Sequence, residues 1–308
     1  MLVFRTLYPF ISRYILNFSY LIIVFYFLSS CQTKPNPPLS PFILTSIAPY
    51  KYFIETIAGN DLKVQVFVPE GISPHSFEPT TKQMLSANEA LVWFQTGDPF
   101  EYLMTPVMQK NNPKMIIANL QEGLPLLFSE NHSHCHSKNK HIQNGADVHT
   151  WLSPKLAKQQ AKTIAAALIQ AFPERESQFN TGLKQLLMSL DQIDTEITNL
   201  LKNYAGHSIM VSHSAFSYFC NDYHLKQLSI ECEGKDPKTR YATKIFDHAR
   251  REKIHTVFVQ KQCNNKAANR IANELGLKNV FLNPYSEDYL NNLRSIAQEF
   301  YKECLSHE

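Results

Sequence analysis

The sequence predicts an α/β protein with two βα lobes whose sheets are mainly parallel, joined by one long backbone helix. Short apolar runs typical of strands alternate with helical patterns in both the first and the last part of the chain. One long, uninterrupted helical pattern separates the two parts. With 308 residues, the chain is long enough for two lobes and a substantial core. Alternation of this kind is typical of βα units with a parallel sheet.

The first lobe is predicted to cover residues 42–173. Its expected strands are residues 42–47, 62–68, 91–95 and 115–118, and its expected helices are 51–58, 80–90 and 153–172. Ser153 suits an N-cap, and Pro154 suits the first turn of the helix that follows. Pro173 then prevents that helix from continuing.

The linking helix is predicted over residues 174–205. From Leu183 to Leu201, leucine and isoleucine recur at steps of three and four residues, no proline interrupts them, and Gly206 is well placed to end the helix. A helix of this length spans ~45 Å at ~1.5 Å per residue. Because such a connector is stiff, we expect limited closure between the lobes.

The second lobe is predicted to cover residues 206–308, where the alternation resumes. Its expected strands are residues 208–212, 227–231, 256–260 and 279–282, and its expected helices are 216–223, 239–252, 265–275 and 288–305. The two lobes show no convincing sequence repeat.

Residues 1–30 are predicted to form a lipoprotein signal peptide. Arg5 and Arg13 precede an apolar run, and Leu28-Ser29-Ser30-Cys31 resembles a bacterial lipobox. Cleavage before Cys31 would leave that cysteine for lipid attachment, with residues 31–41 as a proline-rich tether. The alternative is a retained transmembrane anchor. In both cases the folded part lies outside the cytoplasm, in the periplasm or on the outer surface.

The charge distribution gives little support for nucleic-acid binding. The formal net charge is +3, and Arg5 and Arg13 in the signal segment contribute two of these charges. The remainder is close to neutral, and no basic stripe follows.

Outside the cytoplasm a disulfide is permitted, and Cys263 with Cys304 is the preferred pair. The cysteine spacings form no CxxC zinc motif. Cys135 is the natural candidate for a free thiol.

Three histidines lie where a predicted strand has just ended or a helix is about to begin: His75, His149 and His213. Loops at the carboxyl ends of parallel strands are where α/β proteins bind ligands, so these histidines could share a site between the lobes. Three neutral imidazoles suit Zn²⁺, while Mn²⁺ and Fe²⁺ can also use imidazole. A lone histidine in such a place is more often a capping or core residue, so placement by itself does not establish a metal site.

The stretches "SPHSFEPT", "DVHTWLSP" and "VSHSAFSYF" resemble, in order, the three histidine motifs of the zinc- and manganese-binding proteins of bacterial ABC importers, the ZnuA/TroA-like family. The segments "IECEGKDP" and "NPYSEDYL" extend the resemblance over nearly the whole mature chain. The resemblance implies two α/β lobes with metal held between them, and delivery to an ABC permease that works with an ATPase. It implies no enzymatic activity, and we expect a monomer.

One position departs from the family pattern. Asn283 stands where the family commonly supplies an aspartate ligand. Because an amide carbonyl is a weak, neutral ligand, water or another side chain could take the fourth position, with Glu231 and Glu233 as alternatives. Three histidines and a neutral position fit zinc better than manganese.

The segment 131–145 is predicted to be a histidine-rich loop, with His132, His134, His136 and His141 among Ser, Asn and Lys. Zinc-type members of the family resemble it in carrying such a loop here. Two interpretations stay open: an accessory zinc collector, and a hydrated loop with incidental metal affinity. The remaining histidines are interpreted as surface or capping residues: His207, His224, His248, His255 and His307.

The sequence therefore predicts an extracytoplasmic, lipid-anchored protein that captures Zn²⁺ and delivers it to a membrane permease. The alternatives are a manganese or iron importer subunit, a three-histidine zinc hydrolase with water as fourth ligand, and a metal-buffering or adhesive surface protein.

Overall fold

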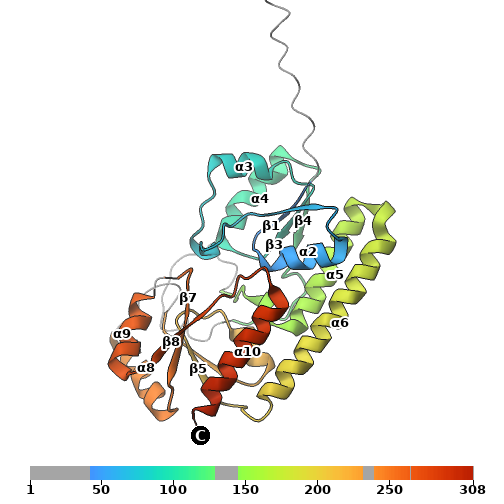
Figure 1. Ribbon diagram of the computed structural model, residues 1–308. Helices are drawn as coiled ribbons and strands as arrows, with labels where there is room; N and C mark the ends of the chain where they lie inside the picture. Colours follow the sequence, from blue (N-terminus) through green and yellow to red (C-terminus); the bar gives the residue numbers. More distant parts are fainter. Residues whose placement is uncertain (1–41, 129–144, 232–238, 264, 308) are drawn as a thin grey trace, which may run out of the picture. The chain divides into compact units, whose positions relative to one another are not determined.

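The computed structural model describes residues 42–128, 145–231, 239–263 and 265–307 (Figure 1). This part of the chain contains two four-stranded sheets, in which every pairing between strands is parallel. The predicted α/β class with two lobes and one long helix is confirmed. Several predicted features lie outside the described residues: the signal peptide, Cys31, the tether, Cys135, Glu233 and the histidines at 132, 134, 136 and 141.

The N-terminal sheet has the strand order β2-β1-β3-β4. Its strands are β1 (Phe42–Thr45), β2 (Lys63–Val66), β3 (Val92–Gln95) and β4 (Ile116–Asn119). The helices of this lobe are α2 (Pro49–Ala58), α3 (Thr81–Ala87), α4 (Pro99–Asn111) and α5 (Pro154–Ala171), with short 3₁₀ turns η1 (Pro74–Ser76), η3 (Thr150–Leu152) and η4 (Pro173–Arg175). As predicted, Ser153 caps α5, because its side chain accepts a hydrogen bond from the backbone N–H of Leu156 at 3.1 Å.

The C-terminal sheet has the equivalent order, β6-β5-β7-β8. Its strands are β5 (Ser208–Val211), β6 (Lys226–Ser229), β7 (Thr256–Gln260) and β8 (Lys278–Leu282), and its helices are α7 (Ser217–Asp222), α8 (Thr239–Arg251), α9 (Lys266–Leu275) and α10 (Tyr289–Leu305). The topology therefore repeats although no sequence repeat is visible. In each sheet the chain moves first to one side of the central strand and then to the other, and the ends of such neighbouring strands form a natural ligand site.

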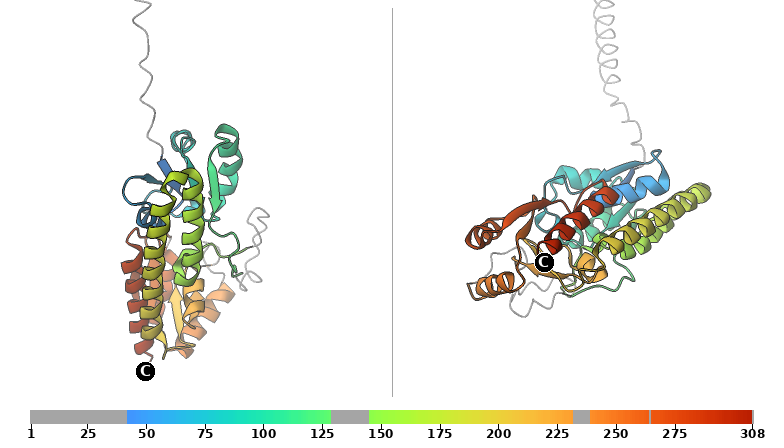
Figure 2. Two further views of the ribbon diagram at one scale, coloured as in Figure 1. Left: turned by 90° about the vertical axis from the view of Figure 1, so that its right-hand side faces the viewer. Right: turned by 60° about the horizontal axis from the view of Figure 1, so that its bottom comes forward.

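The long helix α6 (Glu176–Leu201) runs beside both lobes (Figures 1 and 2). It packs against α2 and α5 of the N-terminal lobe and against α10 of the C-terminal lobe. Gly182 permits the contact with α2, because a Cβ at this position would lie 2.4 Å from the backbone oxygen of Ile57. The helix is thus closely fitted to the first lobe.

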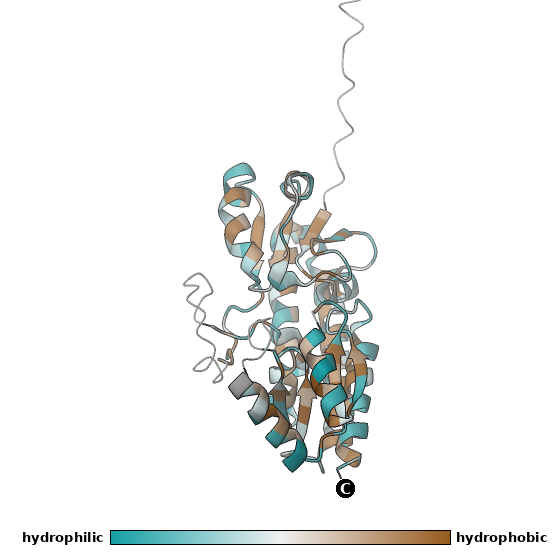
Figure 3. Cartoon of the chain, turned by 90° about the vertical axis from the view of Figure 1, so that its left-hand side faces the viewer, coloured by the Kyte–Doolittle hydropathy of each residue, from teal (hydrophilic) through white to brown (hydrophobic). Residues whose placement is uncertain are grey.

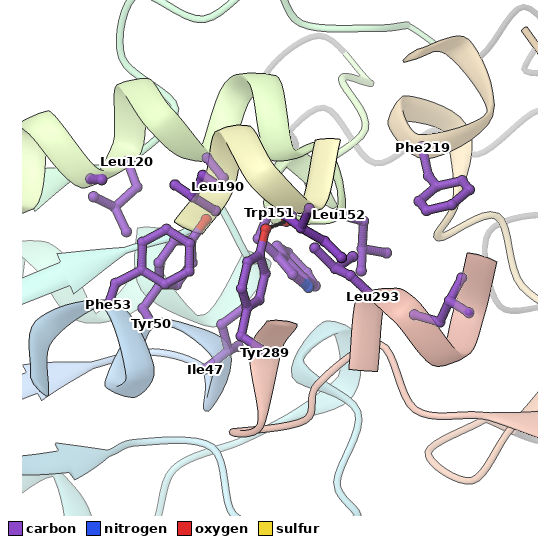
Figure 4. Packing of buried hydrophobic residues seen from close by; sticks show 14 of the residues in the cluster. Ile47, Tyr50, Phe53, Leu120, Trp151, Leu152, Leu190, Phe219, Tyr289 and Leu293 are labelled. Carbon is purple, nitrogen blue, oxygen red and sulfur yellow. Dashed lines mark hydrogen bonds between the residues drawn. The ribbon is translucent and has the colours of Figure 1, made fainter. Parts of the chain in front are cut away.

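One hydrophobic cluster extends through both lobes. Figure 4 shows part of this cluster, where Trp151 of the first lobe lies beside Tyr289 of α10. The Tyr289 hydroxyl donates to the Trp151 carbonyl at 2.6 Å, and the Trp151 indole N–H donates to the Pro284 carbonyl at 2.8 Å. Both aromatic side chains are fully buried. The lobes consequently share a core.

The outer sides of the helices are largely hydrophilic and the strands largely hydrophobic (Figure 3). Among the described residues, none of the helices has both the length and the apolar character needed to cross a membrane.

The helix α4 has no counterpart among the predicted elements, which leave residues 96–114 unassigned. Its sequence runs against the usual pattern, since Glu101 is 2% exposed and Leu103 is 80% exposed. Pro106 also lies inside the helix. Both features obscure the apolar periodicity that identifies a helix.

The predicted disulfide between Cys263 and Cys304 is wrong for this structure, in which both residues are free thiols. Cys263 follows the carboxyl end of β7. Cys304 is buried beside Glu303, whose carboxylate accepts a hydrogen bond from the backbone N–H of His255 at the amino end of β7. A five-residue strand separates the two ends by ~16 Å, which is too far for a disulfide.

Candidate metal centre

The three predicted histidines lie where the carboxyl ends of the two sheets face each other. His75 lies in η1, beyond the end of β2. His149 immediately precedes η3, and its backbone N–H donates to Asp147 Oδ1 at 2.9 Å. His213 follows β5, two residues after its last residue. The parallel arrangement of the strands therefore brings side chains from distant parts of the sequence to one place.

The three imidazole rings direct their Nε2 atoms towards one another. His75 Nε2 lies 3.1 Å from His149 Nε2 and 3.2 Å from His213 Nε2. Two nitrogen ligands at ~2.0–2.1 Å from a tetrahedral zinc ion are separated by ~3.3–3.4 Å. The arrangement of the three nitrogen atoms thus fits one face of a tetrahedral metal site. His149 and His213 are buried, and the His75 side chain is 26% exposed.

Each imidazole has a carboxylate on its other nitrogen. His149 Nδ1 lies 2.7 Å from Asp147 Oδ1, and His75 Nδ1 lies 3.0 Å from Asp98 Oδ1. His213 Nδ1 is 3.7 Å from Glu231 Oε2; this distance permits an ion pair but exceeds the length of a good hydrogen bond. A carboxylate on Nδ1 keeps a proton there and leaves the lone pair of Nε2 for a metal ion.

Asp98 is held by a buried network at the end of β3. The hydroxyl of Thr96 contacts Asp98 Oδ2 at 2.8 Å, and the backbone N–H groups of Thr96 and Gly97 donate to the Glu101 carboxylate at 2.8 and 2.7 Å. Asp98 is fully buried. Burial, followed by the negative charge of Asp98, raises the pKa of Glu101 to about 7. Glu101 of α4, a helix that the sequence did not reveal, thus orients the loop with Asp98, which in turn contacts His75.

The protonation preferences of the histidines differ. Burial lowers the pKa of His75, but its hydrogen bond to Asp98 and the charge of Asp98 outweigh this effect, so its pKa is raised. Burial and then the positive charges of His75 and His149 hold the pKa of His213 well below its ordinary value. His213 is therefore neutral and able to act as a ligand, whereas protons compete for His75 in mildly acidic solution.

Asn283 does not direct a free oxygen towards this centre. Its Oδ1 accepts hydrogen bonds from Gln262 Nε2 at 2.9 Å and from the backbone N–H of Tyr285 at 3.1 Å. The hydroxyl of Tyr285 reaches the site instead and lies 3.5 Å from His149 Nε2. Asn283 and Tyr285 also line a cavity of about 350 Å³ between the lobes.

The comparisons with known proteins agree with this geometry. The model of the family described as zinc-uptake complex component A, periplasmic, matches residues 43–303. The chain belongs to this zinc-uptake family. It is 31% identical over 271 residues to a putative metal-binding protein of Chlamydia trachomatis, covering 84% of this chain and 90% of that protein.

Two solved structures of the ZnuA family are also similar, each with 30% sequence identity and coverage of 86% of this chain. One is a crystal structure of ZnuA with a TM-score of 0.78, of which 99% is covered. The other is a ZnuA deletion mutant with zinc bound, with a TM-score of 0.77 and 98% covered. As a ZnuA-family member, this chain is an extracytoplasmic metal-binding protein of a transport family, whose members work with ABC permease and ATPase components.

In this ZnuA-family protein, sequence reasoning identified the three converging histidines but not two of the carboxylates behind them. Asp147 is part of the quoted motif "DVHTWLSP", two residues before His149, and Asp98 follows a predicted strand. Their positions could have suggested partners for the histidines. Glu231, considered as a fourth ligand, lies instead on the Nδ1 side of His213.

Proposed function

We propose that the protein captures Zn²⁺ with His75, His149 and His213 and delivers it to a membrane permease. The observation that carries this proposal is the convergence of three Nε2 atoms, each in an imidazole whose Nδ1 faces a carboxylate. Such a donor set is typical of zinc sites, and the close carboxylates give His75 and His149 the tautomer that binds metal.

The charge balance of the site also suits a divalent cation. Three neutral imidazoles carry no charge, but Asp98, Asp147 and Glu231 lie directly behind them. These carboxylates compensate for the aspartate that Asn283 replaces. We propose that water or the Tyr285 hydroxyl completes the coordination, because Asn283 Oδ1 already accepts two hydrogen bonds.

Zinc is favoured over manganese because nitrogen atoms surround the centre, whereas Mn²⁺ prefers oxygen ligands. A zinc hydrolase is disfavoured because the nearby carboxylates lie on the Nδ1 side of the rings, away from the position where a metal-bound water would react. The family itself consists of transport proteins.

The histidine-rich segment is proposed to be an accessory zinc collector. The two chain ends that border it are held together, because Phe128 and Ala146 form a β-bridge and the Asp147 backbone N–H donates to the Leu127 carbonyl at 2.8 Å. The Tyr218 hydroxyl bridges the same two chain ends, because it accepts a hydrogen bond from the Leu127 N–H and donates one to the Asp147 carbonyl. This junction directly precedes His149, so zinc released from the segment would have a short path to the centre.

The decisive test is a titration of Zn²⁺ and Mn²⁺ into metal-free mature protein. The one tightly bound zinc equivalent at the His75 centre should be lost in His75→Ala and retained when residues 131–141 are deleted. The opposite pattern would make the histidine-rich segment the principal site. A manganese affinity equal to that for zinc would refute the proposed metal preference.

The membrane attachment is proposed to occur through a lipid on Cys31 after removal of residues 1–30. Metabolic labelling with a fatty acid should modify the wild type and not Cys31→Ala. Labelling of both would place the lipid elsewhere.

We further propose that the shared core and α6 limit closure between the lobes. A large compaction in solution scattering upon zinc binding would refute this.

A further inference from the structure

A second cluster of metal-ligating side chains lies at the other end of the C-terminal sheet. His255, Glu303 and His307 each offer one ligand atom, and these atoms lie within 4.8 Å of one another. His255 immediately precedes β7, whereas Glu303 is in the last turn of α10 and His307 lies two residues beyond its end. The cluster is thus at the amino ends of the strands, and the proposed transport site is at their carboxyl ends.

The carboxylate of Glu303 is the buried member of this cluster. Its side chain is 1% exposed. Oε1 accepts a hydrogen bond from the backbone N–H of His255 at 2.8 Å and lies 3.0 Å from His307 Nε2. Within the described part of the chain, Oε2 is buried without a hydrogen-bond partner. A buried carboxylate oxygen without a partner is costly, and a metal ion beside it would remove that cost.

The hydrogen bonds around the cluster fix the tautomer of His255. The Ser306 hydroxyl donates its only proton to the Glu303 carbonyl at 2.6 Å. Ser306 Oγ can therefore only accept from His255 Nδ1, which lies 3.1 Å away. The proton of neutral His255 consequently resides on Nδ1, and Nε2 carries the free lone pair that a metal ligand requires.

A fourth side chain, that of His207, packs against the cluster. The ring of His207 stacks on the ring of His307 with their centroids 5.3 Å apart. His207 Nδ1 lies 3.0 Å from the Tyr204 carbonyl and must donate to it, so the neutral ring has its free lone pair on Nε2. The side chain of His307 is 8% exposed, which leaves His255 as the solvent-facing member.

We propose that His255, Glu303 and His307 bind a second divalent metal ion of the zinc type, separate from the transported ion. Two imidazole nitrogens and one carboxylate oxygen form a common zinc donor set. The bound ion would connect the end of α10 to the start of β7. It would stabilise the folded protein by preferential binding to it, independently of whether the His75 centre transports metal.

The test measures zinc in the His75→Ala background, where the proposed transport site is disabled. We expect His75→Ala/Glu303→Gln and His75→Ala/His307→Ala each to bind one zinc equivalent per chain fewer than His75→Ala, by native mass spectrometry. Both should also lose the zinc-dependent rise in melting temperature that this site provides. The matched control is His75→Ala/His248→Ala, which removes a histidine of the same lobe that contacts Ser208. It should keep the full zinc content.

Circular dichroism without added metal establishes that each variant is folded. Glu303→Gln is nearly isosteric and retains an acceptor for the His255 backbone N–H, while His255→Ala changes an exposed side chain and provides a further test if either buried variant unfolds. Unchanged zinc content in the folded variants would overturn the proposal. Since His75 is absent throughout, this result is independent of any failure of the proposed transport site.

Discussion

Replacing Asp98 by Asn tests whether the carboxylates behind the histidines support metal binding. Asp98 is fully buried and lies 3.0 Å from His75 Nδ1, so solvent screens this contact little. Loss of such a partner typically reduces metal affinity by about 10- to 100-fold, or about 1.4–2.8 kcal/mol. Glu231→Gln should reduce metal affinity by less than about tenfold, because the Glu231 carboxylate is 3.7 Å from His213 Nδ1 and makes no good hydrogen bond to it.

The effect of Asp98→Asn should also depend on pH. In the wild type, Asp98 raises the pKa of His75 against the opposing effect of burial, so it strengthens proton binding as well as metal binding. Removing its charge weakens both. The loss of zinc affinity should therefore be larger at pH 8 than at pH 6, because protons compete for His75 more strongly in the wild type as the pH falls.

The assay is a competition titration with a chelating zinc indicator at both pH values. Asp61→Asn is the matched control, because its carboxylate is 74% exposed and pairs with Arg175 away from the site. An Asp98→Asn protein that binds zinc as tightly as the wild type at pH 8 would refute the reasoning. So would an affinity loss in Asp61→Asn of similar size.

Three further outcomes are expected. Gly182→Ala should lower the free energy of unfolding by about 1–3 kcal/mol in urea titrations, because the clash with the Ile57 carbonyl exceeds the gain in helix propensity; unchanged stability would contradict the close contact. The raised pKa of Glu101, about 7, means that its contribution to stability is complete below its ordinary value of 4.5 and is lost as the pH rises through 7. Metal-free wild type should therefore lose stability between pH 5 and pH 8 relative to Glu101→Gln, and parallel pH profiles would argue against this. Tyr285→Phe should reduce zinc affinity by less than about tenfold in the same competition titration, because a neutral hydroxyl contributes little; a loss above a hundredfold would identify the hydroxyl as a ligand.

The sequence predicts those elements and site residues whose local pattern agrees with their place in the structure. The central strands β1, β3, β5 and β7 are short, mainly apolar runs, and the three histidines stand at strand or helix ends, so both could be predicted. The helix α4 could not, because it buries Glu101 and exposes Leu103. That inversion has a local reason, since the buried carboxylate accepts the N–H groups that shape the loop before Asp98.

The side-chain contacts of the site could not be predicted, because they depend on distances in space between residues that are far apart in the sequence. Asn283 matches a family ligand position, yet its oxygen accepts from Gln262 and Tyr285. The sequence permits a disulfide between Cys263 and Cys304, but these residues lie near opposite ends of β7. Similarly, His255 and His307 were interpreted as surface or capping residues. Their grouping with Glu303 arises only when α10 returns to the amino end of the sheet.

The core shared by the two lobes has a consequence for metal preference. Trp151 and Tyr289 are buried against each other through the hydrogen bond between the Tyr289 hydroxyl and the Trp151 carbonyl. We expect this contact to influence the spacing of the lobes, and hence the separation between His213 on one side and His75 and His149 on the other. A change in the volume of either aromatic side chain would alter the bond lengths available to an ion without changing any ligand. Adaptation to a larger or smaller metal could therefore begin in the hydrophobic interior.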